Sequence, residues 1–400
     1  MIAAADVISQ LRDIGIGRLT SVPCSYFTGI LRHVESPARP NLPHLAAVNE
    51  GNALALAAGS WLGGVPAAVL AQNSGFGNLV NPLTSLLLPY RIPALVFLSM
   101  RGWPAAEPGE PQHAEMGRVV PAWLDSLDIP YRFLTADGAP LAGVLAELAP
   151  ALADRRPAFV LTGKGVFDPG SSVSADGGGA DSAGAGIDRA ALVTALLAER
   201  QSEFILATTG YLSRELFNAG DVPANFYMQG SMGHAAAIAL GVAMARPDRR
   251  VLVLDGDGAL LMHLGVGASI GHVQPANLLH VVYDNAGYES TGGQPTAAGR
   301  VDFAAAATAL GYRRTSEVSR SDELPAAVAD LLSGAGPALL VVRGIPSGIP
   351  SGRASEAIST EQIAARFAAA LAEPGAPAFS QGRQLPGPQQ GPLLTGAAVR

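Results

Sequence analysis

The chain has 400 residues, a length that accommodates two or three domains. Hydrophobic residues make up 48% of it and charged residues only 15%, so a large share of the chain must be buried in cores or at a subunit interface. A net charge of −7 argues against a nucleic-acid partner. No apolar run reaches the roughly 18 residues of a membrane span, which excludes an integral membrane protein. The single cysteine, Cys24, excludes an internal disulfide and fits a reducing cytosol, so we expect a cytoplasmic protein.

Apolar runs of strand length recur along the chain. Residues 1–15 precede them and have the pattern of an amphipathic helix, with Asp6 arguing against a signal peptide. The runs, most of which end in Gly, Ser or Asn, lie at 67–75, 93–102, 203–210, 249–258, 278–285 and 338–344. Continuous apolar strands separated by helix-length segments predict parallel sheets that are covered on both faces.

Two low-complexity stretches divide the chain. Residues 168–187, rich in Gly, Ser and Ala, are predicted to be a flexible linker, and residues 373–400, rich in Pro, Gly and Gln, a disordered tail. We therefore predict two α/β domains, at 1–167 and 188–372, each a mostly parallel sheet with helices on both faces. Because ligands of such sheets bind beyond the carboxyl ends of the strands, the functional residues should follow directly after the apolar runs.

One motif at a predicted strand end indicates a bound metal and diphosphate. The run before Gly256-Asp257-Gly258 leads into a helical pattern, and the next run ends at Asn285, 28 positions after Asp257. If the two strands are adjacent, Asp257 and Asn285 meet. A carboxylate, an amide oxygen and a backbone carbonyl suit Mg²⁺, while the glycines let a helix start close on a diphosphate. An ordinary turn with a capping aspartate is the alternative.

At these residues the chain resembles the thiamine-diphosphate enzymes, whose cofactor signature is GDG followed at about this distance by Asn. The resemblance implies that Asp257, Asn285 and the carbonyl of Gly287 bind Mg²⁺. It also implies that the carbonyl of Gly230 accepts a hydrogen bond from the aminopyrimidine and that Met232 wedges the two rings into a bent shape. From its own pattern, Met232 is equally a core residue. The implied cofactor-binding residues are Glu50, Gly230, Ser231, Met232, Gly256, Asp257, Gly258, Ala259, Asn285, Gly287 and Tyr288.

Glu50 is the expected activator of the cofactor. It opens an Ala/Leu-rich helical pattern, and no other charged residue follows before position 76. From the residues alone, a solvent-exposed glutamate at a helix N-terminus is equally consistent. The resemblance implies instead a buried carboxylate that bonds to the pyrimidine ring and drives removal of the thiazolium proton. It further implies that Glu50 and the diphosphate site come from different subunits, so that a homodimer or homotetramer is obligatory.

A closer resemblance, over most of residues 1–372, is to the phosphonopyruvate decarboxylases and their relatives, the sulfopyruvate decarboxylases. The segments that carry it are VPCSYF (22–27), NEGNALALAAG (49–59), QNSGFGNLVNPLTSLL (72–87), RG (101–102), EPQHAEMG (110–117), TTG…SRELF (208–217), FYMQGSMGHA (226–235), DGDGALLMHLG (255–265) and ESTGGQPT (289–296). It implies non-oxidative decarboxylation of a 3-substituted pyruvate to an aldehyde and CO₂, with phosphonopyruvate and phosphonoacetaldehyde as the expected pair. The small-molecule partner is thus a 2-oxo acid.

Several residues are candidates for substrate chemistry. His113 is the expected proton shuttle because histidine titrates near neutral pH, although a surface or core-bonded histidine is the alternative. Ser25 would place a neutral hydroxyl where an acid would repel a dianionic substrate. Arg101 and Arg214 either bind the anionic tail or form ordinary ion pairs. The remaining substrate-binding candidates are Asn73, Gln112 and Tyr211.

The chain also departs from the phosphonopyruvate decarboxylase pattern. Tyr211 stands where that family usually has Lys, Tyr288 falls where it has His, and Gly109 replaces an Asp. Two phenols in place of cationic side chains lower the positive charge near the reacting carbon. Sulfopyruvate or an uncharged 3-substituted pyruvate therefore stays open as the substrate.

Three other functions compete with decarboxylation. A carboligase of the acetolactate type would use the same cofactor, but the two-domain build argues against it. A nucleotide-binding protein could use GDG as its phosphate loop, yet no G-x-G-x-x-G follows the early strands. A non-catalytic scaffold is disfavoured because Glu50, Asp257 and Asn285 are all present.

Overall fold

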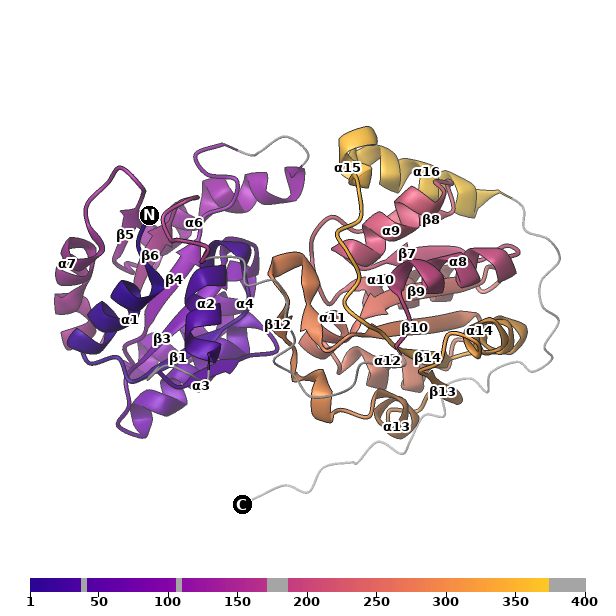
Figure 1. The fold of residues 1–400 in the computed structure, drawn as a ribbon, viewed down its shortest axis with the longest axis horizontal. Helices are drawn as coiled ribbons and strands as arrows, with labels where there is room; N and C mark the ends of the chain where they lie inside the picture. The colour runs from indigo at the N-terminus through magenta and orange to yellow at the C-terminus, as the bar shows by residue number, and fades with distance from the viewer. Residues whose placement is uncertain (37–41, 106–109, 171–185, 374–400) are drawn as a thin grey trace, which may run out of the picture.

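The computed structural model describes residues 1–36, 42–105, 110–170 and 186–373, and Figure 1 shows two α/β domains lying side by side. Each domain contains one six-stranded sheet, and each sheet falls inside one of the two predicted blocks. The predicted linker and tail lie almost wholly outside the described residues. In the described part of the chain, no helix is long and apolar enough to cross a membrane.

The first domain is a fully parallel sheet in the order β2-β1-β3-β4-β6-β5. Its strands are β1 (Arg18–Ser21), β2 (His44–Ala46), β3 (Ala67–Gln72), β4 (Leu95–Ser99), β5 (Tyr131–Leu134) and β6 (Ala158–Thr162). Its helices are α1 (Ala4–Asp13), η1 (Ser25–Phe27), α2 (Thr28–Glu35), α3 (Glu50–Leu62), η2 (Asn73–Gly75), α4 (Phe76–Pro82), η3 (Leu83–Leu87), α5 (Leu88–Tyr90), η4 (Pro111–His113), α6 (Ala114–Ser126) and α7 (Leu141–Ala153).

The second domain repeats this architecture in the order β13-β14-β10-β9-β7-β8, again parallel throughout. Its sheet strands are β7 (Phe204–Ala207), β8 (Asn225–Tyr227), β9 (Val251–Gly256), β10 (Leu278–Asp284), β13 (Arg314–Val318) and β14 (Ala338–Arg343), and β11 (Gly287–Tyr288) pairs with β12 (Gln294–Pro295) in a separate antiparallel hairpin. Its helices are α8 (Arg189–Glu199), α9 (Tyr211–Ala219), α10 (Ala235–Ala245), α11 (Asp257–Met262), α12 (Val266–Val273), η5 (Glu289–Thr291), η6 (Ala297–Arg300), α13 (Phe303–Ala309), α14 (Leu324–Ser333), α15 (Ala354–Ala357) and α16 (Thr360–Ala372).

Both sheets are buried on two faces, which explains why their strands read as continuous apolar runs. In the first domain Leu70 and Phe97 pack into one core, while their neighbours Val69 and Val96 pack into the core on the opposite face. Successive side chains of a strand point to opposite faces, so a strand covered on both sides needs apolar residues at every position. The six runs identified in the sequence are all strands, and the predicted fold class is confirmed.

The helical pattern after Gly258 forms two helices instead of one. Helix α11 ends at Met262, where His263 leaves the helical conformation with φ −138° and ψ 45°. The break leaves the carbonyl of Met262 available, and it accepts a hydrogen bond of 3.2 Å from Nδ2 of Asn49, the residue that caps α3 in the first domain. The interruption thus provides a bond between the domains.

Candidate active site

The parallel pairing of β9 and β10 brings the predicted metal ligands to one edge of the sheet. Gly256 lies opposite Tyr283 in the register, so both strands end at nearly the same level. Asp257 begins α11 directly after β9, and Asn285 follows β10. The predicted adjacency of these two strand ends is confirmed.

The surroundings of Asp257 fit a bound dication. The carboxylate is buried, and the hydroxyl of Thr296 donates a hydrogen bond of 2.5 Å to its Oδ2. Burial raises the pKa of Asp257 to about 6, while the bond from Thr296 works against the shift. No ion pair of the described residues includes Asp257. Burying an anion without a cation is costly, so Mg²⁺ would supply the charge that the protein lacks here. Thr296 is not among the site residues predicted from the sequence.

Neighbouring side chains pack so closely against the GDG motif and against the turn before α10 that the backbone there needs glycine. A Cβ on Gly258 would lie 2.5 Å from the ring of Tyr288, and a Cβ on Gly230 would lie 3.2 Å from Cβ of Gln112. Ser231 has a positive φ of 55° in the tight turn that precedes α10. The turn therefore faces the 110–113 segment of the first domain, and the roles predicted for Gly230, Ser231 and Met232 stay predictions.

Glu50 is buried, which excludes the alternative of a solvent-exposed glutamate at a helix N-terminus. It opens α3 directly after the cap residue Asn49 and is only 4% exposed. Nδ2 of Asn78 donates a hydrogen bond of 2.7 Å to Oε2, and a Cβ on Gly75 would lie 2.0 Å from Oε1. Burial raises the pKa of Glu50, against the effect of the bond from Asn78. A carboxyl in such surroundings holds a proton more readily than one in water.

Glu50 and Asp257 lie on elements that contact each other, since Nδ2 of Asn49, the residue before Glu50, donates to the carbonyl of Met262 at the end of α11. Burial raises the pKa of Tyr288 to about 12, and the carboxylates of Asp257 and Glu50 both contribute to the shift. The expectation that different subunits supply these groups stays a prediction. The domains are joined by contacts such as the 3.2 Å bond from the hydroxyl of Thr28 to the carbonyl of Thr291.

The substrate candidates of the first domain form one polar group. Oε2 of Glu110 lies 3.3 Å from Nη1 of Arg101 and 3.7 Å from Nε2 of His113. Arg101 also donates to the hydroxyl of Ser25. The amide of Asn73 bonds to the backbone of Arg101 on both sides, at 2.7 and 3.2 Å, so the structure shows Asn73 positioning the arginine. Direct substrate contacts of these residues stay predictions.

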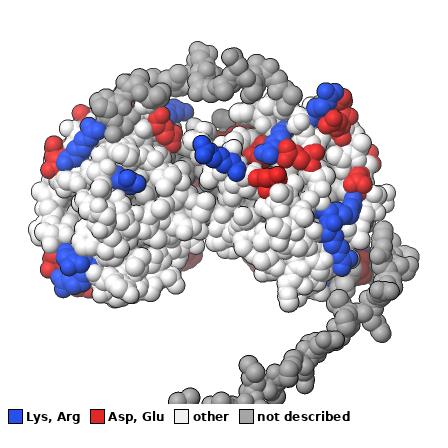
Figure 2. All heavy atoms as spheres, turned by 90° about the horizontal axis from the view of Figure 1, so that it is seen from below, with Lys and Arg blue, Asp and Glu red and all other residues white. Residues whose placement is uncertain are grey.

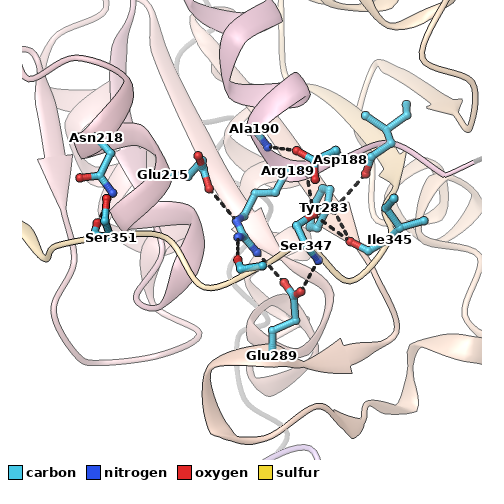
Figure 3. A network of polar contacts seen from close by, with 12 residues as sticks. Asp188, Arg189, Ala190, Glu215, Asn218, Tyr283, Glu289, Ile345, Ser347 and Ser351 are labelled. Atoms are coloured by element: carbon cyan, nitrogen blue, oxygen red, sulfur yellow. Dashed lines mark hydrogen bonds and ion pairs between the residues drawn. The ribbon is translucent and has the colours of Figure 1, made fainter. Parts of the chain in front are cut away.

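Tyr211 contacts two arginines in the second domain. The guanidinium of Arg189 lies 5.2 Å from the centre of its ring, and that of Arg214 lies 5.3 Å away. Arg189 is 1% exposed and bonds to Glu215 at 3.2 Å and to Glu289 at 2.6 Å (Figure 3). Arg189 is thus compensated by two carboxylates, and Arg214 is the guanidinium that stands near the position of the family's lysine. Arg189 is not among the residues predicted for the site, because a single arginine beside a linker has no pattern of its own.

Comparisons with known proteins identify the class. Residues 213–342, which include Asp257, Asn285 and Tyr288, match the family model "Thiamine pyrophosphate enzyme, C-terminal TPP binding domain". This match and the paired strand ends define an enzyme built for thiamine diphosphate.

Proteins of similar sequence show which family of thiamine-diphosphate enzymes this is. The chain is 39% identical to a phosphonopyruvate decarboxylase of Streptomyces viridochromogenes, over 94% of this chain and 96% of the relative. It is also 39% identical to the phosphonopyruvate decarboxylase of Streptomyces hygroscopicus, over 94% of this chain and 95% of the relative. A sulfopyruvate decarboxylase of Methanosarcina acetivorans is 28% identical over 79% of this chain and 84% of the relative. The chain therefore belongs to the phosphonopyruvate decarboxylase family, and the expected membership is confirmed.

The first prediction tests the metal site. Asp257→Ala should lower the affinity for thiamine diphosphate in the presence of Mg²⁺ by about a hundredfold or more, because a charged ligand is lost from a site with few ligands. Isothermal titration calorimetry measures the affinity, with Asp248→Ala, a surface position in the same domain, as control. The cofactor-free variant should melt no lower than the wild type, since a buried unpaired carboxylate is removed. Equal affinity in both proteins would refute the assignment of Asp257.

Proposed function

We propose that the chain catalyses the thiamine-diphosphate- and Mg²⁺-dependent decarboxylation of phosphonopyruvate to phosphonoacetaldehyde and CO₂. The observation that carries the proposal is buried Glu50 at the domain junction, where Asn49 bonds to the end of α11, the helix that Asp257 begins; Arg101, Glu110 and His113 form a second polar group of the first domain. Membership of the phosphonopyruvate decarboxylase family supports the reaction and the substrate.

Each group of the site has a defined task in this proposal. Bound thiamine diphosphate supplies a carbon nucleophile and an acceptor for the electrons that the departing CO₂ leaves behind. Asp257, Asn285 and the carbonyl of Gly287 would hold Mg²⁺, which would balance the negative charge of the diphosphate. The Glu50 carboxyl holds a proton at the pyrimidine ring, and Nε2 of His113 delivers a proton to the product.

The contacts of Tyr211 favour an anionic substrate over an uncharged one. The lysine of the family pattern is absent, but Arg189 and Arg214 both pack against the tyrosine ring. Arg189 is paired with Glu215 and Glu289, whereas the cation–π contact holds the guanidinium of Arg214 without neutralising its charge. The same contacts suit a sulfonate, and sulfopyruvate is the second candidate because a sulfopyruvate decarboxylase is among the relatives.

We also propose that the protein is a homo-oligomer in the cytoplasm. Helices α3 and α10 carry apolar residues on all sides, and they expose Leu56, Leu62, Ile238 and Met244. A helix that is apolar all round is normally buried, so a second copy of the chain is the fitting cover. Figure 2 shows a face on which large areas of both domains carry no charged side chain. The buried free thiol of Cys24 is consistent with a reducing compartment.

The second prediction concerns Glu50. Glu50→Gln keeps the size of the side chain and can still accept the bond from Asn78, but it cannot hold the proton. We expect thiamine diphosphate to bind with unchanged affinity, while exchange of its thiazolium proton with deuterium slows by roughly 10²–10⁴-fold. Acid quenching followed by proton NMR measures the exchange. An unchanged exchange rate would show that another group activates the cofactor.

The third prediction tests the reaction itself. The enzyme with Mg²⁺ and thiamine diphosphate should release aldehyde from phosphonopyruvate at a higher kcat/KM than from sulfopyruvate, and faster from both than from pyruvate. A coupled aldehyde dehydrogenase assay measures each rate. Acetolactate formation from pyruvate, or no aldehyde from any 2-oxo acid, would contradict the proposed function.

The fourth prediction concerns assembly. Met244→Glu and Leu62→Glu should each lower the molar mass that light scattering reports toward that of one chain, because burying an unpaired carboxylate at an apolar interface is costly. Val222→Glu, at an exposed apolar position outside α3 and α10, serves as control. A wild type that runs as a single chain at high concentration would contradict the interface.

A further inference from the structure

A segment after the last strand of the second domain returns to the first domain. It runs from Ile345 to Arg353 between β14 and α15 and is fixed along its length (Figure 3). The hydroxyl of Tyr283 donates to the carbonyl of Ile345 at 2.7 Å, and the backbone N–H of Ser347 donates to Oε1 of Glu289 at 2.6 Å. Arg189 donates to the carbonyl of Gly348 at 2.6 Å. Nearer the end of the segment, Nδ2 of Asn218 donates to the carbonyl of Ser351, so bonds hold the segment on both sides of its middle.

Arg353, at the end of this segment, reaches the substrate candidates of the first domain. Its Nη1 lies 2.5 Å from Oε1 of Glu110, whose other oxygen faces Arg101 and His113. The backbone N–H of Arg353 donates to Oε2 of Glu356 at 3.1 Å, which fixes the start of α15. The Arg353 side chain is 29% exposed, so its guanidinium is held in place yet accessible to a ligand.

Helix α9 places Arg214 near Arg353, because Nδ2 of Asn218, one turn after Arg214, donates to the carbonyl of Ser351, two residues before Arg353. Burial lowers the pKa of Arg214, and the positive charge of Arg353 lowers it further, against the effects of Tyr211, Glu356 and Glu110. In the described part of the chain, no carboxylate lies within ion-pair distance of Arg214. Two guanidinium groups are thus held near each other, and nearby carboxylates do not fully compensate their positive charge. This arrangement favours binding of an anion.

We propose that Arg353, together with Arg101 and Arg214, binds the anionic substituent on carbon 3 of the substrate, and that Glu110 positions these guanidinium groups. The inference rests on the proposed function. It assigns to these residues the recognition of the phosphonate or sulfonate group that the substrate carries. Both substituents are tetrahedral oxyanions, whose oxygens match the planar donors of guanidinium. Gln112, two residues after Glu110, lies against the Gly230 turn, so the anion subsite adjoins the predicted cofactor site.

Arg353 has an alternative role as a structural ion pair that only joins the domains. The two roles predict different results. A structural pair would change the binding of all ligands alike, whereas a subsite would change only the binding of those that carry the anion.

Binding of unreactive ligands separates the two roles. 3-Phosphonopropionate, 3-sulfopropionate and butyrate share a carboxylate and differ in a phosphonate, a sulfonate or a methyl group at the position of interest. Calorimetry on the protein loaded with thiamine diphosphate and Mg²⁺ gives their affinities. The wild type should bind the first two at least about tenfold more tightly than butyrate, and Arg353→Met should remove most of this preference. Arg353→Lys should restore part of it.

Two further variants complete the test. Arg366→Met is the matched control, because Arg366 pairs with Asp221 at 2.6 Å elsewhere in the same C-terminal region, and it should leave all three affinities unchanged. Arg214→Met should reproduce the selective loss. An equal loss for all three ligands in Arg353→Met, or no loss for any, would overturn the inference. Either result leaves the proposed reaction standing if the wild type releases aldehyde, whereas selective binding without aldehyde release would support the subsite and refute the reaction.

Discussion

The parallel pairing of β9 with β10 determines where the other groups of the site lie. With Gly256 opposite Tyr283, both strands end together, so Asp257 and Asn285 enter the same space. A slip of one residue would move each side chain to the opposite face of the sheet. The chain then turns back through the β11–β12 hairpin, and the backbone N–H of Thr296 donates to the carbonyl of Ala286 at 3.0 Å. This return places the hydroxyl of Thr296 on Asp257, so the support of the carboxylate depends on the same strand end.

A buried arginine connects this edge with the rest of the second domain. Arg189 bonds to Glu289, which follows the hairpin strand β11, and to Glu215 on α9, while its third nitrogen donates to the segment that leads to Arg353. A buried cation is tolerated only when its donors are satisfied, and breaking such a network is strongly destabilising. The positions of the Glu289 loop, α9 and the returning segment are therefore coupled through one side chain.

The sequence predicted the parts of the molecule that follow local patterns. Apolar runs identified the central strands because each sheet is buried on both faces, and the glycines around Asp257 marked a strand exit. The role of Glu50 could be predicted only from the family resemblance. Its burial depends on Gly75 in η2 and Asn78 in α4, which lie beyond the helix that Glu50 begins.

The remaining residues could not be predicted because their partners are far away in the chain. Arg353 meets Glu110 across 243 positions, and Thr296 meets Asp257 across 39. No periodicity or motif spans such separations. The bond between Asn49 and Met262, which joins the two domains of one chain, is equally invisible in the sequence.

The distance between Glu110 and Arg353 along the chain has a consequence for synthesis. Domains fold as units, and the amino-terminal one folds first as the chain leaves the ribosome. The first domain contains Glu50, His113 and Arg101, and the strands that carry Asp257 and Asn285 emerge next. Arg353 appears only after β14, the last strand of the second sheet. The contact that completes the arginine cluster thus forms after both sheets have emerged, and a nascent chain contains the catalytic groups before it contains all of those proposed to select the substrate.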